Sequence, residues 1–190
     1  DPNLLVGRVR NQNYRELQND PAMPLFNRAL MAQYPPGSAF KVVNTLIAMQ
    51  ENVVNLNTQY SCSGAYSSGG ITVRCRNHPG PVNVFSSIQY SCNTFSAITF
   101  RNILDKPGGG NIQSRFSAWR QHVLSFGFGQ VFGSDLPFEL SGLVVSPDYY
   151  DRIYGPRGWR SLTIVSLSIG QGELGTTPIQ LANLAAIVAN

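Results

Sequence analysis

The sequence contains few charged residues and very few lysines. Charged side chains make up 13% of the 190 residues, and only two of the fourteen basic residues are lysines. The arginines are scattered, so no basic run forms a stripe for nucleic acid, and no aromatic residues alternate with basic ones to stack bases. We therefore expect no nucleic-acid partner, and the net charge of +4 indicates at most a mild preference for anionic substrates.

Long hydrophobic runs are also lacking, and no stretch has the length of a membrane span or the pattern of a signal peptide. The first residue is Asp1 rather than methionine, and Asn190 directly follows a predicted helix. We expect from these two ends that the sequence is an excised piece of a longer protein. Its hydrophobic content of 43% and aromatic content of 11% are typical of one globular domain with a buried core.

The most informative stretch is residues 34–41, which read Tyr-Pro-Pro-Gly-Ser-Ala-Phe-Lys. The two prolines fix an extended entry and Gly37 allows a tight bend, so that Ser38 begins a helix predicted to end near Glu51. This helix is apolar on almost every side, and we expect it to be buried. Ser38 and Lys41 lie three residues apart, which places them on one face of the helix.

A lysine in a buried helix favours a chemical role. Burial disfavours the charged ammonium, so a neutral Lys41 would serve as a base toward Ser38. The free N–H groups at the helix start would stabilise an oxyanion that develops beside Ser38. The alternative is a helix cap followed by a lysine that extends to solvent, because Ser-x-x-Lys alone is a weak pattern.

The remaining pattern predicts a mostly α fold with a small hairpin. Hydrophobic periodicity predicts helices at 25–31, 82–90, 94–104, 116–126 and 177–189, and the hairpin falls at 66–74. Residues 133–160 have the composition of a loop. The glycine run at 108–110 is not followed by Gly-Lys-Ser/Thr, so we do not interpret it as a phosphate-binding loop.

A second motif, Ser91-Cys92-Asn93, falls between two predicted helices about fifty residues after Ser38. Together with the Pro-Pro-Gly-Ser-x-x-Lys stretch, it resembles the first two motifs of the penicillin-recognising serine enzymes. Nearly the whole chain resembles the transpeptidase domain of class B penicillin-binding proteins, of the penicillin-binding protein 2 type found in Bacteroides-like bacteria. The segments that carry this resemblance are Asn-Arg-Ala at 27–29, Leu-Pro-x-Glu at 136–139, Ser-Ile-Gly-Gln-Gly at 168–172 and Thr-Pro-Ile-Gln-Leu-Ala at 177–182.

The resemblance implies a catalytic role for four residues. Ser38 would be the acylated nucleophile, and Lys41 would take its proton. Ser91 would relay protons between Lys41 and the leaving group, and Asn93 would hold Lys41 and the substrate amide. The substrate would be a peptidoglycan stem peptide ending in D-Ala-D-Ala, and β-lactams would mimic it.

The resemblance also implies an architecture and a cellular setting. We expect the helical lobe of the fold shared by penicillin-binding proteins and serine β-lactamases, without most of its β-sheet. The third family motif, Lys-Thr/Ser-Gly, does not occur in the sequence. Residues 1–190 are therefore expected to be a partial transpeptidase domain with little or no activity alone. The full-length protein would be anchored in the inner membrane with this domain in the periplasm, next to a membrane glycosyltransferase and the elongation machinery.

The three cysteines allow three interpretations: a disulfide, a metal site or free thiols. Cys62 and Cys75 could form a disulfide, with Cys92 free. Alternatively, the three thiols and His78 form a Cys₃His set with a Cys-x-x-His pair, which suits tetrahedral zinc. Some proteins that resemble penicillin-binding protein 2 carry zinc near the active site, so the resemblance implies a structural zinc here and no cofactor for catalysis. Unligated thiols beside a surface histidine are the remaining alternative.

Two other functions compete with the transpeptidase interpretation. Gly170, Gly172 and Gly175 match Gly-x-Gly-x-x-Gly after a strand-like run at 162–169, which is the pattern of a dinucleotide-binding module. The run at 162–169 could equally be a buried helix, because periodicity cannot separate the two at this length. Against it, Pro178 marks the helix start, so the glycines lie before that helix instead of across its first turn. A non-catalytic cell-wall scaffold or a β-lactam sensor would keep the same serine motifs.

Overall fold

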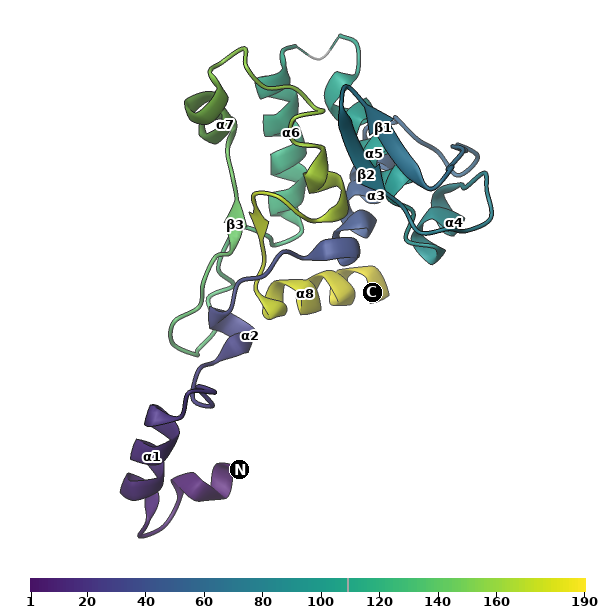
Figure 1. Cartoon of the computed structure of the whole chain (residues 1–190). Coiled ribbons are helices and arrows are strands. Elements are labelled where there is room, and N and C mark those ends of the chain that lie inside the picture. The colour runs from purple at the N-terminus through teal and green to yellow at the C-terminus, as the bar shows by residue number, and fades with distance from the viewer. Residues whose placement is uncertain (109) are drawn as a thin grey trace.

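Helices are the main regular elements of the structure, and the strands form short two-stranded sheets (Figure 1). The computed structural model describes residues 1–108 and 110–190. Short 3-10 helices lie at Pro2–Leu5, Gly37–Ala39 and Val165–Ile169. The other elements are α1 (Arg10–Asn19), α2 (Arg28–Met31), α3 (Phe40–Gln50), β1 (Ala65–Ser68), β2 (Ile71–Arg74), α4 (Val84–Gln89), α5 (Asn93–Asp105), α6 (Ile112–Ser125), β3 (Leu143–Val144), α7 (Pro147–Tyr154), β4 (Leu174–Gly175) and α8 (Pro178–Ala189).

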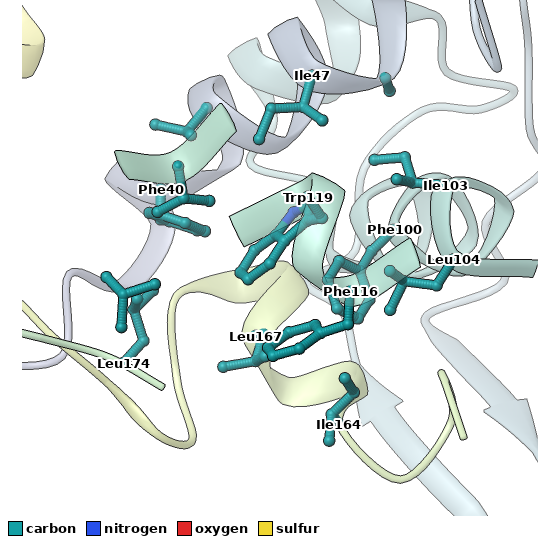
Figure 2. Close-up of a cluster of buried hydrophobic side chains, with 14 of the residues drawn as sticks. Phe40, Ile47, Phe100, Ile103, Leu104, Phe116, Trp119, Ile164, Leu167 and Leu174 are labelled. Atoms are coloured by element: carbon teal, nitrogen blue, oxygen red, sulfur yellow. The ribbon is translucent and has the colours of Figure 1, made fainter. Parts of the chain in front are cut away.

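The core is centred on Trp119 of α6, whose side chain is 1% exposed. Figure 2 shows aromatic rings from three helices around this indole. The ring centroids of Phe40, Phe100 and Phe116 lie 6.1, 5.4 and 5.3 Å from that of Trp119. Large aromatic rings bury more apolar area than any other side chains. This cluster therefore holds α3, α5 and α6 together.

Helix α3 is fixed to the core by a polar contact as well. Asn44 is 1% exposed, and its Nδ2 donates to the carbonyl oxygens of Leu167 and Ser168 at 3.3 and 3.0 Å. Trp119 Nε1 donates to Asn44 Oδ1 at 2.8 Å. Because buried polar groups must find partners, this network specifies one position of α3 relative to the 3-10 helix Val165–Ile169.

One small sheet is a local hairpin, and the other joins distant parts of the chain. Strands β1 and β2 form an antiparallel hairpin in which Ala65 lies opposite Arg74. This hairpin lies beside α5 (Figure 1). Strand β3 pairs with β4, and an isolated bridge joins Tyr34 to Thr176 through N–H···O bonds of 2.9 and 2.8 Å. The bridge holds the chain in an extended conformation just before the turn that contains Ser38.

The N-terminal helix α1 has no buried residue and stands away from the rest of the molecule in Figure 1. Its sequence is almost entirely polar, so it offers no apolar face to a core. Among the described residues, none of the helices combines the length and the apolar character that a membrane-crossing segment needs.

Several element predictions hold and others are wrong. The helices predicted at 82–90, 94–104, 116–126 and 177–189 match α4, α5, α6 and α8 within four residues at each end. The one predicted at 25–31 is limited to Arg28–Met31. Helices α1 and α7 were not predicted, because α1 has no apolar period and α7 is short and begins at Pro147. Gly109, in the glycine run at 108–110, lies outside the described residues.

Candidate active site

Ser38 lies at the surface, at the start of the buried helix α3. It sits in the 3-10 helix Gly37–Ala39, which continues directly into α3, so the predicted helix start is correct except that its first turn is 3-10. Gly37 has φ +59°, and its N–H donates to the Gly170 carbonyl at 2.9 Å. A Cβ on Gly170 would lie 2.2 Å from the Gly37 oxygen, so only glycine allows this close approach. The two backbones together fix the turn that presents Ser38.

Lys41 is buried one turn after Ser38, with 2% of its side chain exposed. Its Nζ donates to the backbone oxygen of Ser91 at 2.6 Å and to the Ser91 Oγ at 2.8 Å. Burial lowers the pKa of Lys41 below its ordinary value of 10.5; it outweighs the opposing charges of Cys75 and Cys92, and Arg76 adds to the lowering. The neutral amine is therefore more populated than in a solvated lysine, which is what a base needs.

The loop between α4 and α5 is shaped to meet Lys41. Ser91 has φ +54°, a left-handed conformation that costs a non-glycine residue about 1–2 kcal/mol. The loop is held by Ser91 N–H donating to Ile88 O at 3.0 Å and Cys92 N–H donating to Ser87 O at 2.8 Å. Such strain persists only where its surroundings enforce it, and here both oxygens of Ser91 face the amine of Lys41.

Asn93 takes a different partner from the one expected. It begins α5, and its Nδ2 donates to the backbone oxygen of Arg74 at 2.7 Å, with no hydrogen bond to Lys41 among the described residues. Strand β2 of the hairpin ends at Arg74, and the Arg74 carbonyl oxygen takes the Asn93 amide N–H that was expected to contact Lys41. Asn93 also lines a cleft of about 430 Å³ together with Arg74 and Gln171. Neither of these two neighbours was predicted as a site residue, although Gln171 lies in the Ser-Ile-Gly-Gln-Gly segment and Arg74 ends the predicted hairpin.

The predicted metal ligands form a compact cluster behind Ser91. The ligand atoms of Cys62, Cys75, His78 and Cys92 all lie within 4.8 Å of one another. Cys75 Sγ lies 3.8 Å from Cys92 Sγ and 3.6 Å from His78 Nε2. All three cysteines are free thiols, so the structure does not contain the alternative disulfide between Cys62 and Cys75.

The cluster has the dimensions of a tetrahedral zinc site. At usual zinc–ligand distances, two sulfur ligands lie about 3.8 Å apart, and a sulfur and an imidazole nitrogen about 3.6 Å apart. His78 Nδ1 lies 2.8 Å from the carbonyl oxygen of Pro79, which orients Nε2 toward the thiols. Burial raises the pKa of Cys92 to about 12. Burial acts the same way on Cys75, but N–H groups including that of Asn93, 3.2 Å from its sulfur, outweigh it and lower its pKa. The residues present fit zinc.

Comparison with known proteins identifies the chain. The family described as "Penicillin binding protein transpeptidase domain" matches residues 4–190. The chain belongs to this family. The peptidoglycan D,D-transpeptidase MrdA of Acinetobacter baumannii is 32% identical to it over the whole chain, which spans 27% of that relative's length.

Solved penicillin-binding proteins have the same fold. The crystal structure of Pseudomonas aeruginosa PBP2 in complex with WCK 5153 superposes with a TM-score of 0.80 at 30% identity, covering 100% of this chain and 41% of that one. PBP2 from Helicobacter pylori, in its complex with MreC, gives a TM-score of 0.76 at 25% identity over 94% of this chain and 32% of that one. The family and the fold class predicted from the sequence, a helical lobe of the transpeptidase fold, are both confirmed.

In this chain the three glycines of the competing pattern allow close packing between neighbouring segments. The run at 162–169 is not a strand but ends in the 3-10 helix Val165–Ile169, so the strand of a dinucleotide-binding unit is missing. A Cβ on Gly172 would lie 2.6 Å from Ser166 Oγ, and one on Gly175 would lie 2.3 Å from Gln33 Nε2. With Gly170 against Gly37, each glycine permits a close approach within the transpeptidase fold.

Proposed function

We propose that this chain supplies the nucleophile and the proton-transfer groups of a peptidoglycan D,D-transpeptidase. The observation that carries the proposal is the pair of buried contacts from Lys41 Nζ to Ser91, one helical turn after the exposed Ser38. Burying the charged form of an amine is unfavourable unless an oppositely charged group pairs with it. Here its two partners are neutral oxygens, which leaves it able to accept a proton.

The proposed reaction uses these positions, and among the described residues no hydrogen bond joins Ser38 to Lys41 before substrate binds. Ser38 Oγ attacks the carbonyl of the penultimate D-Ala of a stem peptide, and its proton passes to the neutral amine of Lys41. The N–H of Ser38 stabilises the oxyanion, since it lies at the start of a helix. Ser91 Oγ, 2.8 Å from Lys41 Nζ, passes the proton on to the departing D-Ala amine. An amine of a neighbouring strand then attacks the acyl-enzyme carbonyl, and its proton returns through Ser91 and Lys41 to the departing Ser38 Oγ, which frees Ser38 and completes the cross-link.

The role of Asn93 in this scheme is on the substrate side. Its Nδ2 donates to the Arg74 carbonyl, and its side chain lines the cleft of about 430 Å³. We assign it to binding the substrate amide, which leaves the contact with Lys41 to Ser91.

Acylation by a fluorescent penicillin tests the proposal in the complete protein that carries this chain. We expect one covalent adduct on a peptide containing Ser38, and its loss in Ser38→Ala. Ser125→Ala, an exposed serine at the end of α6, is the matched control and should label at the wild-type rate. An unchanged adduct in Ser38→Ala would refute the proposal. A complete protein that binds stem peptide but never becomes acylated would instead be a scaffold.

We further propose that residues 1–190 are one part of a transpeptidase domain that works in the periplasm with a membrane glycosyltransferase and elongation proteins. The support is that a Helicobacter pylori PBP2 with the same fold is in complex with MreC. Co-purification of the complete protein from crosslinked cells should recover these partners, and their absence would contradict this assignment.

We also propose that the Cys₃His cluster holds a structural zinc. Cys62, Cys75, His78 and Cys92 would ligate it, and the ion would order a segment that has little apolar content of its own. Cys92 follows Ser91 directly and caps α5 by accepting from Phe95 N–H at 3.3 Å. The cluster is therefore placed to hold the loop that carries Ser91.

Metal analysis of protein purified without chelator tests the zinc site. We expect one zinc per chain and a thermal midpoint that falls when a chelator removes it. His78→Gln should lose the metal. His122→Gln should retain it, because His122 lies on α6 and pairs with Glu51 instead. A wild-type protein free of zinc and indifferent to chelator would refute the site.

A further inference from the structure

A second pocket lies at the far end of α5 from the candidate active site. It has a volume of about 600 Å³ and is formed by the end of α5, the start of α6 and the segment after α7, which meet at the top of Figure 1. Helix α5 begins at Asn93 and ends at Asp105, so the two sites are separated by about 18 Å along its axis. The proposed transpeptidase reaction does not use this pocket.

The lining of the pocket is strongly basic. Five basic side chains and one acidic side chain line it. The acidic residue, Asp105, is already engaged: its carboxylate accepts from Arg101 at 3.2 Å and from Ser161 Oγ at 2.7 Å. Asp151 does not line the pocket but accepts from two residues that do, Gln113 Nε2 at 3.1 Å and Trp159 Nε1 at 2.6 Å. The excess positive charge of the pocket is therefore not neutralised by the acids around it.

Arg115 of α6 is the most informative of the basic residues. Its side chain is 9% exposed and lines the pocket, yet its guanidinium makes no ion pair or hydrogen bond with any described residue. A guanidinium always carries its charge. None of the Arg115 nitrogens is a fully buried atom that lacks a partner, so the guanidinium stays accessible at the end of a mostly buried side chain, where a bound anion could pair with it.

The other basic residues divide into two groups. Arg101 and Lys106 are engaged with protein groups, Arg101 with Asp105 and Lys106 with the Glu51 carbonyl oxygen at 2.6 Å. Arg157 and Arg160 are exposed at the rim and take part in no ion pair among the described residues. Three arginines, one inside and two at the rim, are therefore free to meet a ligand.

We propose that this pocket binds a ligand that carries a phosphate or pyrophosphate group. Guanidinium groups match phosphate oxygens in a two-pronged geometry, and three of them can neutralise a multiply charged group. The N-terminus of α6, a helix of 14 residues, opens at the same wall and adds the positive end of its dipole. The volume suits a small charged headgroup with room for its attached chain.

Titration of the complete protein with inorganic pyrophosphate tests the site. Trp159 lines the pocket, so its fluorescence should change with saturation, and calorimetry should give the same dissociation constant. We expect Arg115→Gln to weaken binding at least tenfold. Arg152→Gln removes the same charge from an exposed position on α7 and should leave the constant within twofold. Penicillin labelling should stay unchanged in both variants, which separates this site from the active site.

Two sources could provide the phosphate, and vesicles distinguish them. Binding to phosphatidylglycerol vesicles that is absent with phosphatidylcholine, lost in Arg115→Gln and displaced by pyrophosphate identifies a lipid headgroup. Pyrophosphate binding without vesicle binding identifies a soluble ligand. The proposal is overturned if pyrophosphate does not saturate by low millimolar concentrations, if the two arginine variants lose affinity equally, or if citrate binds more tightly than pyrophosphate.

Discussion

Replacing Lys41 with methionine separates a catalytic lysine from a structural one. The lysine is 2% exposed and its amine has two partners, both on Ser91, at 2.6 and 2.8 Å. Methionine keeps most of the buried volume and removes only the amine. The change therefore tests the amine itself and not the packing of α3.

The expected effects on rate and stability differ in size. Removing a general base typically slows a reaction 10²- to 10⁴-fold, which is about 3–5 kcal/mol of activation free energy. For the free energy of unfolding, two lost hydrogen bonds cost about 2 kcal/mol together. Burial disfavours the charged form of the Lys41 amine, as its lowered pKa indicates. Removing the amine relieves this penalty, which offsets part of the cost of the two lost hydrogen bonds. We expect acylation to fall at least 100-fold while stability changes by less than about 2 kcal/mol.

Asn44→Ala is the matched control because Asn44 is a buried polar residue on the same helix. Its loss leaves Trp119 Nε1 and the carbonyl groups of Leu167 and Ser168 without partners, which we expect to cost about 3 kcal/mol or more. The assays are fluorescent-penicillin labelling rate and urea unfolding of the complete protein. If Lys41→Met kept more than a tenth of the wild-type rate, or lost rate only in proportion to stability as Asn44→Ala does, the amine would not be the base.

Three further predictions concern the same region. The acylation rate should rise with pH and level off around a midpoint below 10.5, because only unprotonated Lys41 accepts a proton and burial lowers its pKa; a midpoint at or above 10.5 in a pH–rate profile would contradict this. Gly170→Ala should reduce the labelling rate by displacing the Ser38 turn, whereas Gly133→Ala, with φ +71° but open space around it, should not; equal rates in the two variants would exclude the contact as the cause. Trp119→Phe should lower the free energy of unfolding by about 2–4 kcal/mol through a cavity and the lost bond to Asn44, and a urea midpoint equal to wild type would be inconsistent with the core described here.

Local sequence was enough wherever one short segment decides the geometry. The Ser38-x-x-Lys41 spacing places both residues on one helical turn, and the structure has them on adjoining 3-10 and α turns. The Cys75-x-x-His78 pair is similarly local, and its ligand atoms lie 3.6 Å apart. Helix α8 begins as expected, because a threonine cap and Pro178 mark its first turn.

Where local signals were weak, the sequence left alternatives open. The run at 162–169 is apolar enough for either a strand or a buried helix, and the structure folds it as a turn and a 3-10 helix, because apolar periodicity cannot separate the two at that length. Helix α7 lies in a segment of loop-like composition, and its buried Tyr150 is placed there by contacts with Phe116 and Trp159. Such contacts follow from packing and not from the order of nearby residues.

The sequence by itself determined the family, the helical class and the residue types that the proposed chemistry needs. Only the tertiary structure decided that both oxygens of Ser91, fifty positions along the chain, accept hydrogen bonds from Lys41. It also decided that the Asn93 amide donates to Arg74 and not to Lys41. It further decided that the mostly buried side chain of Arg115 lines a pocket at the other end of α5, where no described residue pairs with its guanidinium. Helix geometry relates residues a turn apart, whereas partners from distant segments are chosen by how the helices pack, which no local spacing encodes.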